Sequence, residues 1–370
     1  MTTRDGAVLD FTSSLYLGLC HPSEALRPWD RITMGRPAAL GEPADARAVA
    51  GGLAALQGCE RATLAPSTLH LFWDLFGMFD RRRTAIYLDA GTYPVARWGV
   101  ERAAARGIPV RRFAHHDPSQ LRQLLGRDAG SRRAPLVVAD GVCPACGGAA
   151  PLGEYLAAAR ARAGQLVIDD TQALGILGET PTPGAPYGSG GGGSLRWNRI
   201  GGSDVLVVSS LAKGFGAPLA ALAGSGPAIE RFEERSDTRV HSSPPSIAAL
   251  RAAERALAIN ARRGDALRRR LWGLVRFFQA LLRKAGLATK GGIFPVQTIV
   301  PTPGRDPAEQ HQRLLEMGVR TVLRREHHRG GARISVLITA RHEPKDLERV
   351  VAALASAWST RQRRAVAMEV

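Results

Sequence analysis

The sequence predicts an α/β fold: a large domain with a mostly parallel β-sheet flanked by helices, followed by a small C-terminal α/β domain. Two observations support this prediction. Short apolar runs alternate with longer segments in which apolar residues recur every three or four positions, the patterns of buried strands and amphipathic helices. Two of these runs, 166–168 and 205–208, end in polar residues and then glycine, as strands do where an open α/β sheet holds a ligand.

The remaining elements follow the same alternation along the chain. Apolar residues at spacings of three and four predict large-domain helices, and short apolar runs predict the strands between them. The expected helices cover 46–58, 69–79, 95–106, 118–126, 152–164 and 226–236, and the expected strands cover 84–89, 108–113, 135–139, 166–168 and 205–208. A long helix over 244–285 then leads to strands near 293–300 and 333–339 with helices over 307–317 and 343–358.

A chain of 370 residues is long enough for more than one domain. We expect an N-terminal arm over 1–30, a large ligand-binding domain over 31–245, an interdomain helix over 246–285 and a small domain over 286–370. The glycine-rich insert 181–194 is expected to be a mobile loop, because its composition is that of a flexible linker.

The two central strands deliver Asp169 and Lys213. A lysine just past a buried strand, flanked by serine and glycine and partnered by an aspartate from a neighbouring strand, suits the attachment of pyridoxal 5'-phosphate (PLP). The lysine binds the aldehyde carbon, and the carboxylate pairs with the protonated pyridine nitrogen. Taken singly, Asp169 is more often a strand-end cap and Lys213 a solvated loop lysine. Their combination in this order favours a PLP site.

Ser67 and Thr68 stand where the helix 69–79 is about to begin. Free N–H groups and the positive end of the helix dipole favour a phosphate at such a position. A plain serine or threonine N-cap explains the local sequence equally well.

Several segments of the chain resemble the α-oxoamine synthases, fold-type-I PLP-dependent transferases related to the class I and II aminotransferases. The resemblance extends along nearly the whole chain, and its motifs occur in the family's order. The segments are LDFTSSLYLGL (9–19), IDDTQALGILG (168–178), SSLAKGFG (209–216), SSPPSIAAL (242–250) and RISVLITARHEPKDLERVV (333–351).

The resemblance implies a homodimer with its site at the subunit boundary, and it implies a role for each matched residue. Lys213 holds the cofactor and is the base for the substrate, Asp169 pairs with the pyridine nitrogen, and Tyr93 stacks on the ring as the third catalytic residue. The remaining cofactor-binding residues are Ser67, Thr68, Leu69, Gln172 and Ser210, with Ser242 reaching the site from the second subunit.

Several positions depart from the family pattern. Tyr93 and Gln172 each stand where the family has histidine, so the ring contact and the hydrogen bond to the phenolic oxygen remain available but an imidazole base does not. Two departures concern substrate binding: Ser14 stands in place of an asparagine and is expected to bind the substrate there, and Ser335 replaces the arginine that fixes the substrate carboxylate. Arg333, two residues earlier on the same strand face, is a substitute, although a surface or interface arginine explains it as well. The family's longer N-terminal helix is also missing.

Composition excludes several classes of protein. The formal net charge is +17, but the arginines are dispersed along helices without interleaved aromatic residues, so a nucleic-acid partner is not expected. No apolar run approaches the ~20 residues of a membrane span, and no signal sequence is evident, so a cytoplasmic location is expected. Cys143 and Cys146 form a C-x-x-C pair without two further ligands nearby, so a metal site is not expected.

The sequence is compatible with three functions. The first is condensation of an amino acid with an acyl thioester, accompanied by loss of carbon dioxide. The second is transamination by a related PLP enzyme acting on an amine or amino acid, with which Tyr93 is compatible. The third is a non-catalytic regulator or binding protein on the same fold, against which the intact Asp169 and Lys213 argue.

Overall fold

The structure is a computed structural model that describes residues 8–301, 303–326 and 331–359. Within it the chain forms two compact units. One comprises residues 17–143 and 148–268, and the other takes in β1 (Leu9–Asp10), residues 144–147 and the chain from Arg269 onward. The domain boundaries expected from the sequence stay predictions.

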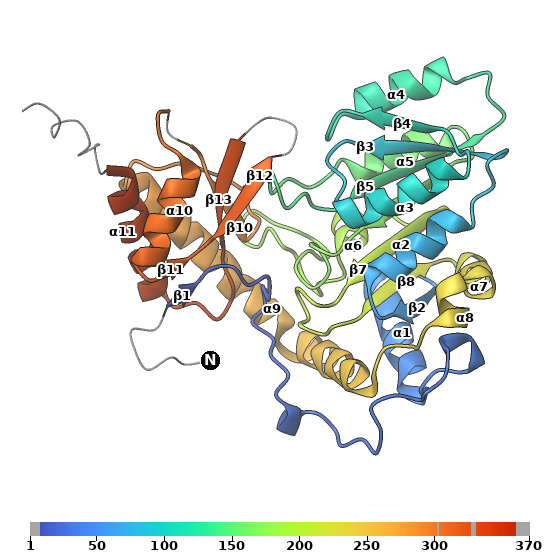
Figure 1. Ribbon diagram of the computed structural model, residues 1–370, viewed down its shortest axis with the longest axis horizontal. Coiled ribbons are helices and arrows are strands. Elements are labelled where there is room, and N and C mark those ends of the chain that lie inside the picture. The colour runs from blue at the N-terminus through green and yellow to red at the C-terminus, as the bar shows by residue number, and fades with distance from the viewer. Residues whose placement is uncertain (1–7, 302, 327–330, 360–370) are drawn as a thin grey trace, which may run out of the picture. The chain divides into compact units, whose positions relative to one another are not determined.

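The larger unit is built on a seven-stranded sheet in the order β2-β8-β7-β6-β5-β3-β4 (Figure 1). Strand β8 is antiparallel to both of its neighbours, and the other pairs are parallel. The strands are β2 (Arg61–Ala65), β3 (Thr84–Asp89), β4 (Val110–Phe113), β5 (Ala134–Asp140), β6 (Gln165–Asp169), β7 (Val205–Ser210) and β8 (Ala220–Gly224).

Helices cover both faces of this sheet because successive strand side chains point to opposite sides. In β3, Ile86 and Leu88 join one apolar core with α2, α3 and α7, whereas Ala85 and Tyr87 join a second core with α4, α5 and α6. The helices of this unit are α1 (Ala44–Gln57), α2 (Thr68–Gly77), α3 (Pro94–Ala105), α4 (Pro118–Arg127), α5 (Leu152–Arg160), α6 (Ser194–Asn198), α7 (Gly226–Arg235) and α8 (Asp237–His241).

The smaller unit contains a four-stranded antiparallel sheet in the order β12-β13-β10-β9, and β1 pairs in parallel with β11. The long helix α9 (Ile247–Lys284) is continuous and contributes its first part to the larger unit and its second part to the smaller one. The other elements are β9 (Thr289–Lys290), β10 (Val296–Ile299), β11 (Val319–Arg320), β12 (Val322–Glu326), β13 (Gly331–Leu337), α10 (Pro307–Glu316) and α11 (Pro344–Ser359).

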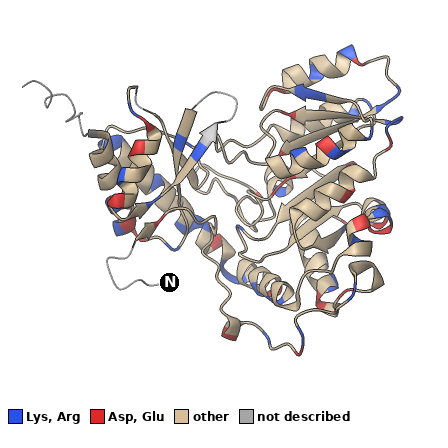
Figure 2. Cartoon of the chain, viewed as in Figure 1, with Lys and Arg blue, Asp and Glu red and all other residues tan. Residues whose placement is uncertain are grey.

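These elements confirm the predicted fold class of an α/β protein with a mostly parallel sheet flanked by helices. The sequence did not predict β8, whose residues are alanine, leucine and glycine and so carry little strand preference. Figure 2 shows Lys and Arg spread over the helices of both units and interspersed with acidic residues. Among the described residues, no helix is long and apolar enough to cross a membrane.

The expectation of a mobile glycine-rich loop is wrong. Residues 181–194 lie in a compact, hydrogen-bonded segment in which Glu179 and Ser189 exchange backbone hydrogen bonds of 2.8 Å and Tyr187 is buried. The side chains of α9 hold the same segment, since Asn260 donates to the Gly190 carbonyl at 2.8 Å. Glycine serves here for tight turns rather than for flexibility, because several of these residues have positive φ.

Candidate active site at the ends of β6 and β7

Asp169 and Lys213 lie at the same edge of the large sheet. Asp169 is the last residue of β6, and Lys213 lies in the turn that follows β7. Because β6 and β7 are parallel neighbours, their carboxyl ends meet at that edge. Asp169 is 7% exposed and Lys213 is half-buried, so the pair shares a largely dehydrated environment.

Each charge of this pair opposes the pKa shift that burial causes in the other group. Burial lowers the pKa of Lys213, whereas the nearby Asp169 and Asp140 carboxylates oppose that shift. Burial likewise raises the pKa of Asp169, opposed by hydrogen bonds from Thr171 and by the charge of Lys213. The Thr171 N–H donates to Asp169 Oδ1 at 3.0 Å. Within the described part of the chain, the Lys213 amine has neither a hydrogen bond nor an ion pair, so it is open to a ligand.

Tyr93 lies over this amine. Its ring centroid is 5.5 Å from Lys213 Nζ, and the side chain is 45% exposed. Tyr93 is also the N-cap residue of α3, where Pro94 occupies the first helical position and fixes the direction of the helix. The structure therefore brings together the three residues expected to be catalytic.

The start of α2 is a second part of the site. Ser67 is the N-cap residue, but its side chain makes no capping hydrogen bond and contacts His70 Nδ1 at 2.9 Å instead. The plain N-cap interpretation of Ser67 is therefore not what the structure shows. Thr68 begins the helix, and Leu69 is 45% exposed. The Ser67 side chain therefore does not cap the first N–H groups of α2. Uncapped N–H groups at a helix N-terminus are what an anion site requires.

Ser210 and Gln172 flank the same edge. Ser210 ends β7, and its N–H donates to Thr171 Oγ1 at 3.0 Å. The Ser210 hydroxyl accepts a hydrogen bond from the Ala212 N–H at 3.2 Å, which orients it toward the turn that carries Lys213. Gln172 lies three residues after Asp169 and is 8% exposed. Thr171, which joins the two strand ends, was not predicted as a site residue.

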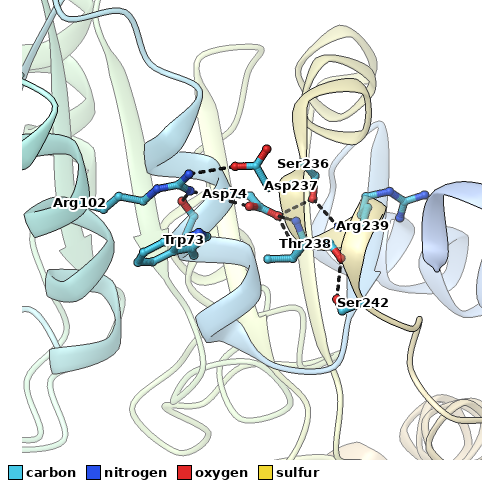
Figure 3. Close-up of polar contacts among 8 residues, drawn as sticks. All are labelled: Trp73, Asp74, Arg102, Ser236, Asp237, Thr238, Arg239 and Ser242. Atoms are coloured by element: carbon cyan, nitrogen blue, oxygen red, sulfur yellow. Dashed lines mark hydrogen bonds and ion pairs between the residues drawn. The ribbon is translucent and has the colours of Figure 1, made fainter.

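Ser242 is fixed by a polar network that begins on α2 (Figure 3). Asp74 Oδ2 accepts hydrogen bonds from the Ser236 hydroxyl, from the Thr238 hydroxyl at 2.6 Å and from the Thr238 N–H at 3.1 Å. The Ser242 hydroxyl in turn donates to the Thr238 carbonyl at 2.5 Å. Arg102 Nη1 lies 3.8 Å from Asp74 Oδ1. The turn that carries Ser242 is thereby tied to the helix that begins with Thr68.

The predicted substrate residues belong to the smaller unit. Ser335 is buried in β13, and its hydroxyl hydrogen-bonds to the Thr298 hydroxyl at 2.8 Å. Arg333 lies two residues earlier in β13, opposite Arg324 of β12. The Ser14 carbonyl accepts the Tyr16 N–H at 2.8 Å. The substrate-binding roles of Ser14 and Arg333 stay predictions.

Two further strands of the large sheet also end in buried aspartates that the sequence analysis did not assign to the site. Asp140 ends β5. Asp89 ends β3 and lies 2.7 Å from His115 Nδ1, and Tyr155 donates to it at 2.9 Å. Burial alone would raise the pKa of Asp89, but the hydrogen bonds from His115 and two N–H groups lower it. The rule that selected Asp169, a polar residue directly after an apolar run, selects both of these residues too.

This set of groups fits PLP. An amine with no protein hydrogen bond is available for the aldehyde, and a buried carboxylate is available for the pyridine nitrogen. Hydroxyls and a helix N-terminus are available for the phosphate, and an aromatic ring faces the amine.

Comparison with known proteins agrees with this fit. The family model for class I and II aminotransferases matches residues 73–354. The 8-amino-7-oxononanoate synthase of Halorhodospira halophila is 31% identical over 360 residues, which are 94% of this chain and 85% of the relative. The Sodalis glossinidius enzyme of the same name is 29% identical over 367 residues, or 96% of this chain and 89% of the relative.

Solved structures show the same fold. Sphingomonas wittichii serine palmitoyltransferase superposes with a TM-score of 0.81 at 20% identity, covering 94% of this chain and 86% of that chain. The 8-amino-7-oxononanoate synthase of Francisella tularensis superposes with a TM-score of 0.76 at 18% identity, covering 94% and 97%. With the matched family model and the relatives along most of its length, this chain belongs to the class I and II aminotransferase family and, within it, to the PLP-dependent α-oxoamine synthases.

Proposed function

We propose that this chain condenses an amino acid with an acyl thioester and releases carbon dioxide, using PLP held by Lys213. The observation that carries the proposal is the Lys213 amine, which has no protein hydrogen bond and lies at the strand edge where Asp169 is buried. The similarity to 8-amino-7-oxononanoate synthases along most of the chain supports condensation over other PLP reactions.

Each residue has a role that its chemistry dictates. When bound, PLP supplies an electron sink for the carbanion at the substrate α-carbon. Asp169 keeps a positive charge on the pyridine nitrogen, because a buried carboxylate favours a cation beside it. Lys213 Nζ accepts the α-proton once it is free, since burial lowers its pKa toward that of a working base. Ser67, Thr68 and Ser210 bind the phosphate, Gln172 binds the phenolic oxygen, and Tyr93 covers the ring.

Cofactor attachment is tested with Lys213→Ala. The wild-type protein incubated with PLP is expected to absorb in the visible range, and borohydride should trap the cofactor on a peptide that contains Lys213. The variant should show neither property, whereas Lys290→Ala, which removes an exposed lysine in β9, should behave as wild type. A wild-type protein that stays colourless in excess PLP would contradict the enzyme function and favour the non-catalytic alternative.

The reaction is tested with a panel of amino acids, with and without acyl thioesters. Condensation predicts that free thiol and carbon dioxide appear together in equal amounts, and that the thioester accelerates loss of the α-proton. Transamination is the second candidate, favoured by Tyr93 in place of the family's histidine. It predicts a keto product without any need for thioester. That outcome would overturn the condensation proposal.

We propose further that the chain is a homodimer with the site at the subunit boundary. Three of its exposed large apolar side chains lie on α2 and α3, the helices that begin at the site: Leu69, Trp73 and Trp98. An apolar surface of this kind, beside a site whose Ser242 is assigned to the neighbouring subunit, supports a second copy as its partner. We also propose a cytoplasmic location, since four cysteines do not make a disulfide scaffold in a chain of 370 residues.

A further inference from the structure

Asp140 is a second buried carboxylate at the sheet edge that carries Lys213. It is the last residue of β5, and its Cα partner in the neighbouring strand β6 is Asp169. Residues directly opposite each other in adjacent strands point to the same face of a sheet, so the two carboxylates leave the sheet side by side. Asp140 is 6% exposed and Asp169 is 7% exposed. Two carboxylates are therefore buried at this end of the sheet, whereas the family resemblance assigns a role only to Asp169.

The hydrogen bonds of Asp140 lead to Tyr93. The Tyr93 N–H donates to both carboxylate oxygens, at 3.0 Å to Oδ1 and 3.1 Å to Oδ2. Tyr93 immediately precedes the first residue of α3, and its ring lies 5.5 Å from Lys213 Nζ. Asp140 thus holds the backbone of the residue whose side chain covers the amine. The contact spans 47 residues of sequence, so only the fold brings the two residues together.

The electrostatics of the site agree with this contact. Burial first, and then the charge of Asp169, hold the pKa of Asp140 well above its ordinary value, and the hydrogen bond from the Tyr93 N–H opposes that shift. The Tyr93 N–H is therefore a partner that stabilises the Asp140 carboxylate at this strand end.

We propose that Asp140 is a positioning residue of the cofactor site, which seats Tyr93 against the cofactor. The inference rests on the proposed function, in which Tyr93 covers the cofactor ring. It assigns Asp140 no bond-making step.

The seating role is tested by PLP affinity in a double-mutant cycle. Asp140→Ala and Tyr93→Ala should each weaken PLP binding about tenfold, and the double variant should bind no more weakly than the weaker single variant, because Asp140 acts through Tyr93. A merely structural role would instead give independent losses that multiply. Either that result or wild-type affinity in Asp140→Ala would overturn the proposal.

Asp140→Asn is the rescue variant, because its amide keeps an oxygen that can accept the Tyr93 N–H. We expect its PLP affinity to stay within about threefold of wild type, because the hydrogen bond that seats Tyr93 is retained.

A loss of PLP affinity in Asp140→Asn as large as that in Asp140→Ala would overturn the proposal. Circular dichroism of each variant establishes that it is folded before its affinity is measured. If the wild-type protein itself fails to capture PLP, the proposed function fails, and the result is distinct from a failure of this inference.

Discussion

Asp169 and Asp170 are adjacent in the sequence, yet their side chains have different partners. Consecutive residues at a strand end point to opposite sides, so Asp169 acts on Lys213 while Asp170 Oδ2 accepts the Ser194 N–H at 2.9 Å. Asp170 and Ser194 are both fully buried. One residue therefore belongs to the site, and the next anchors the segment that ends at α6.

Replacement of Asp169 separates these roles. Asp169→Asn should retain the fold and bind PLP, but kcat should fall about 100-fold or more, because a neutral amide no longer favours a proton on the pyridine nitrogen. Steady-state kinetics with the best amino acid of the panel measures the loss, and the visible absorbance reports cofactor occupancy. Turnover within about threefold of wild type, with full occupancy, would show that Asp169 is only a strand-end cap.

At the scale of elements, the segment between β6 and α6 is held by a buried acid. Burial raises the pKa of Asp170 to about 7, although hydrogen bonds from Ser194 oppose the shift. Gly193 makes the contact possible, because it has φ of 84° and a Cβ there would lie 2.0 Å from Asp170 Oδ2. The packing of this segment is thus sensitive to the ionisation of one carboxyl group.

This sensitivity predicts a pH dependence of stability. The pKa of Asp170 is higher in the folded protein, about 7, than its ordinary value of 3.8, so the folded state binds the proton more tightly. Its contribution to stability is therefore present at low pH and is lost as the pH rises toward 7. Asp170→Asn removes this titration. The difference in free energy of unfolding between the variant and wild type should therefore rise in favour of the variant by roughly 3 kcal/mol between pH 4 and pH 7, and this difference should then stay constant. Denaturant titrations at several pH values measure the difference, and a constant difference would contradict the prediction.

The connection between α2 and α8 depends on Asp74. Asp74 is 3% exposed and accepts three hydrogen bonds from Ser236 and Thr238 (Figure 3). Asp74→Ala should lower the free energy of unfolding by about 3 kcal/mol, because it leaves these donors and Arg102 without their buried acceptor.

Asp237→Ala is the control for this variant. It removes another carboxylate partner of Arg102, 3.0 Å away, but the Asp237 side chain is 67% exposed. Exposed ion pairs contribute little, so its effect should stay within about 0.5 kcal/mol. Equal effects of the two variants in urea unfolding would refute the assignment of Asp74 as the connecting group.

At the scale of the whole molecule, the proposed homodimer predicts a particle of twice the 39.5 kDa chain mass in sedimentation at micromolar concentration. Trp98→Glu places a charge on the apolar surface of α3 and should shift the protein toward monomer with loss of activity. Leu315→Glu, at an exposed apolar position on α10, should leave the dimer intact. A fully active monomer would exclude a site that needs two subunits.

The sequence alone was sufficient for the fold class, for most helices and strands and for the proposed pairing of Lys213 with Asp169. Each of these follows from patterns within a few residues: the periodicity of apolar positions, and polar residues directly after a buried run. Motif order along the chain also sufficed to identify the family.

Only the tertiary structure decided the rest. Strand β8 has a composition that favours no strand and exists because β2 and β7 pair with its two edges. The glycine-rich segment is ordered because α9, distant in sequence, holds Gly190 through Asn260. Asp140 and Asp74 have partners 47 and more than 160 residues away, so their roles depend on long-range contacts that no local pattern encodes.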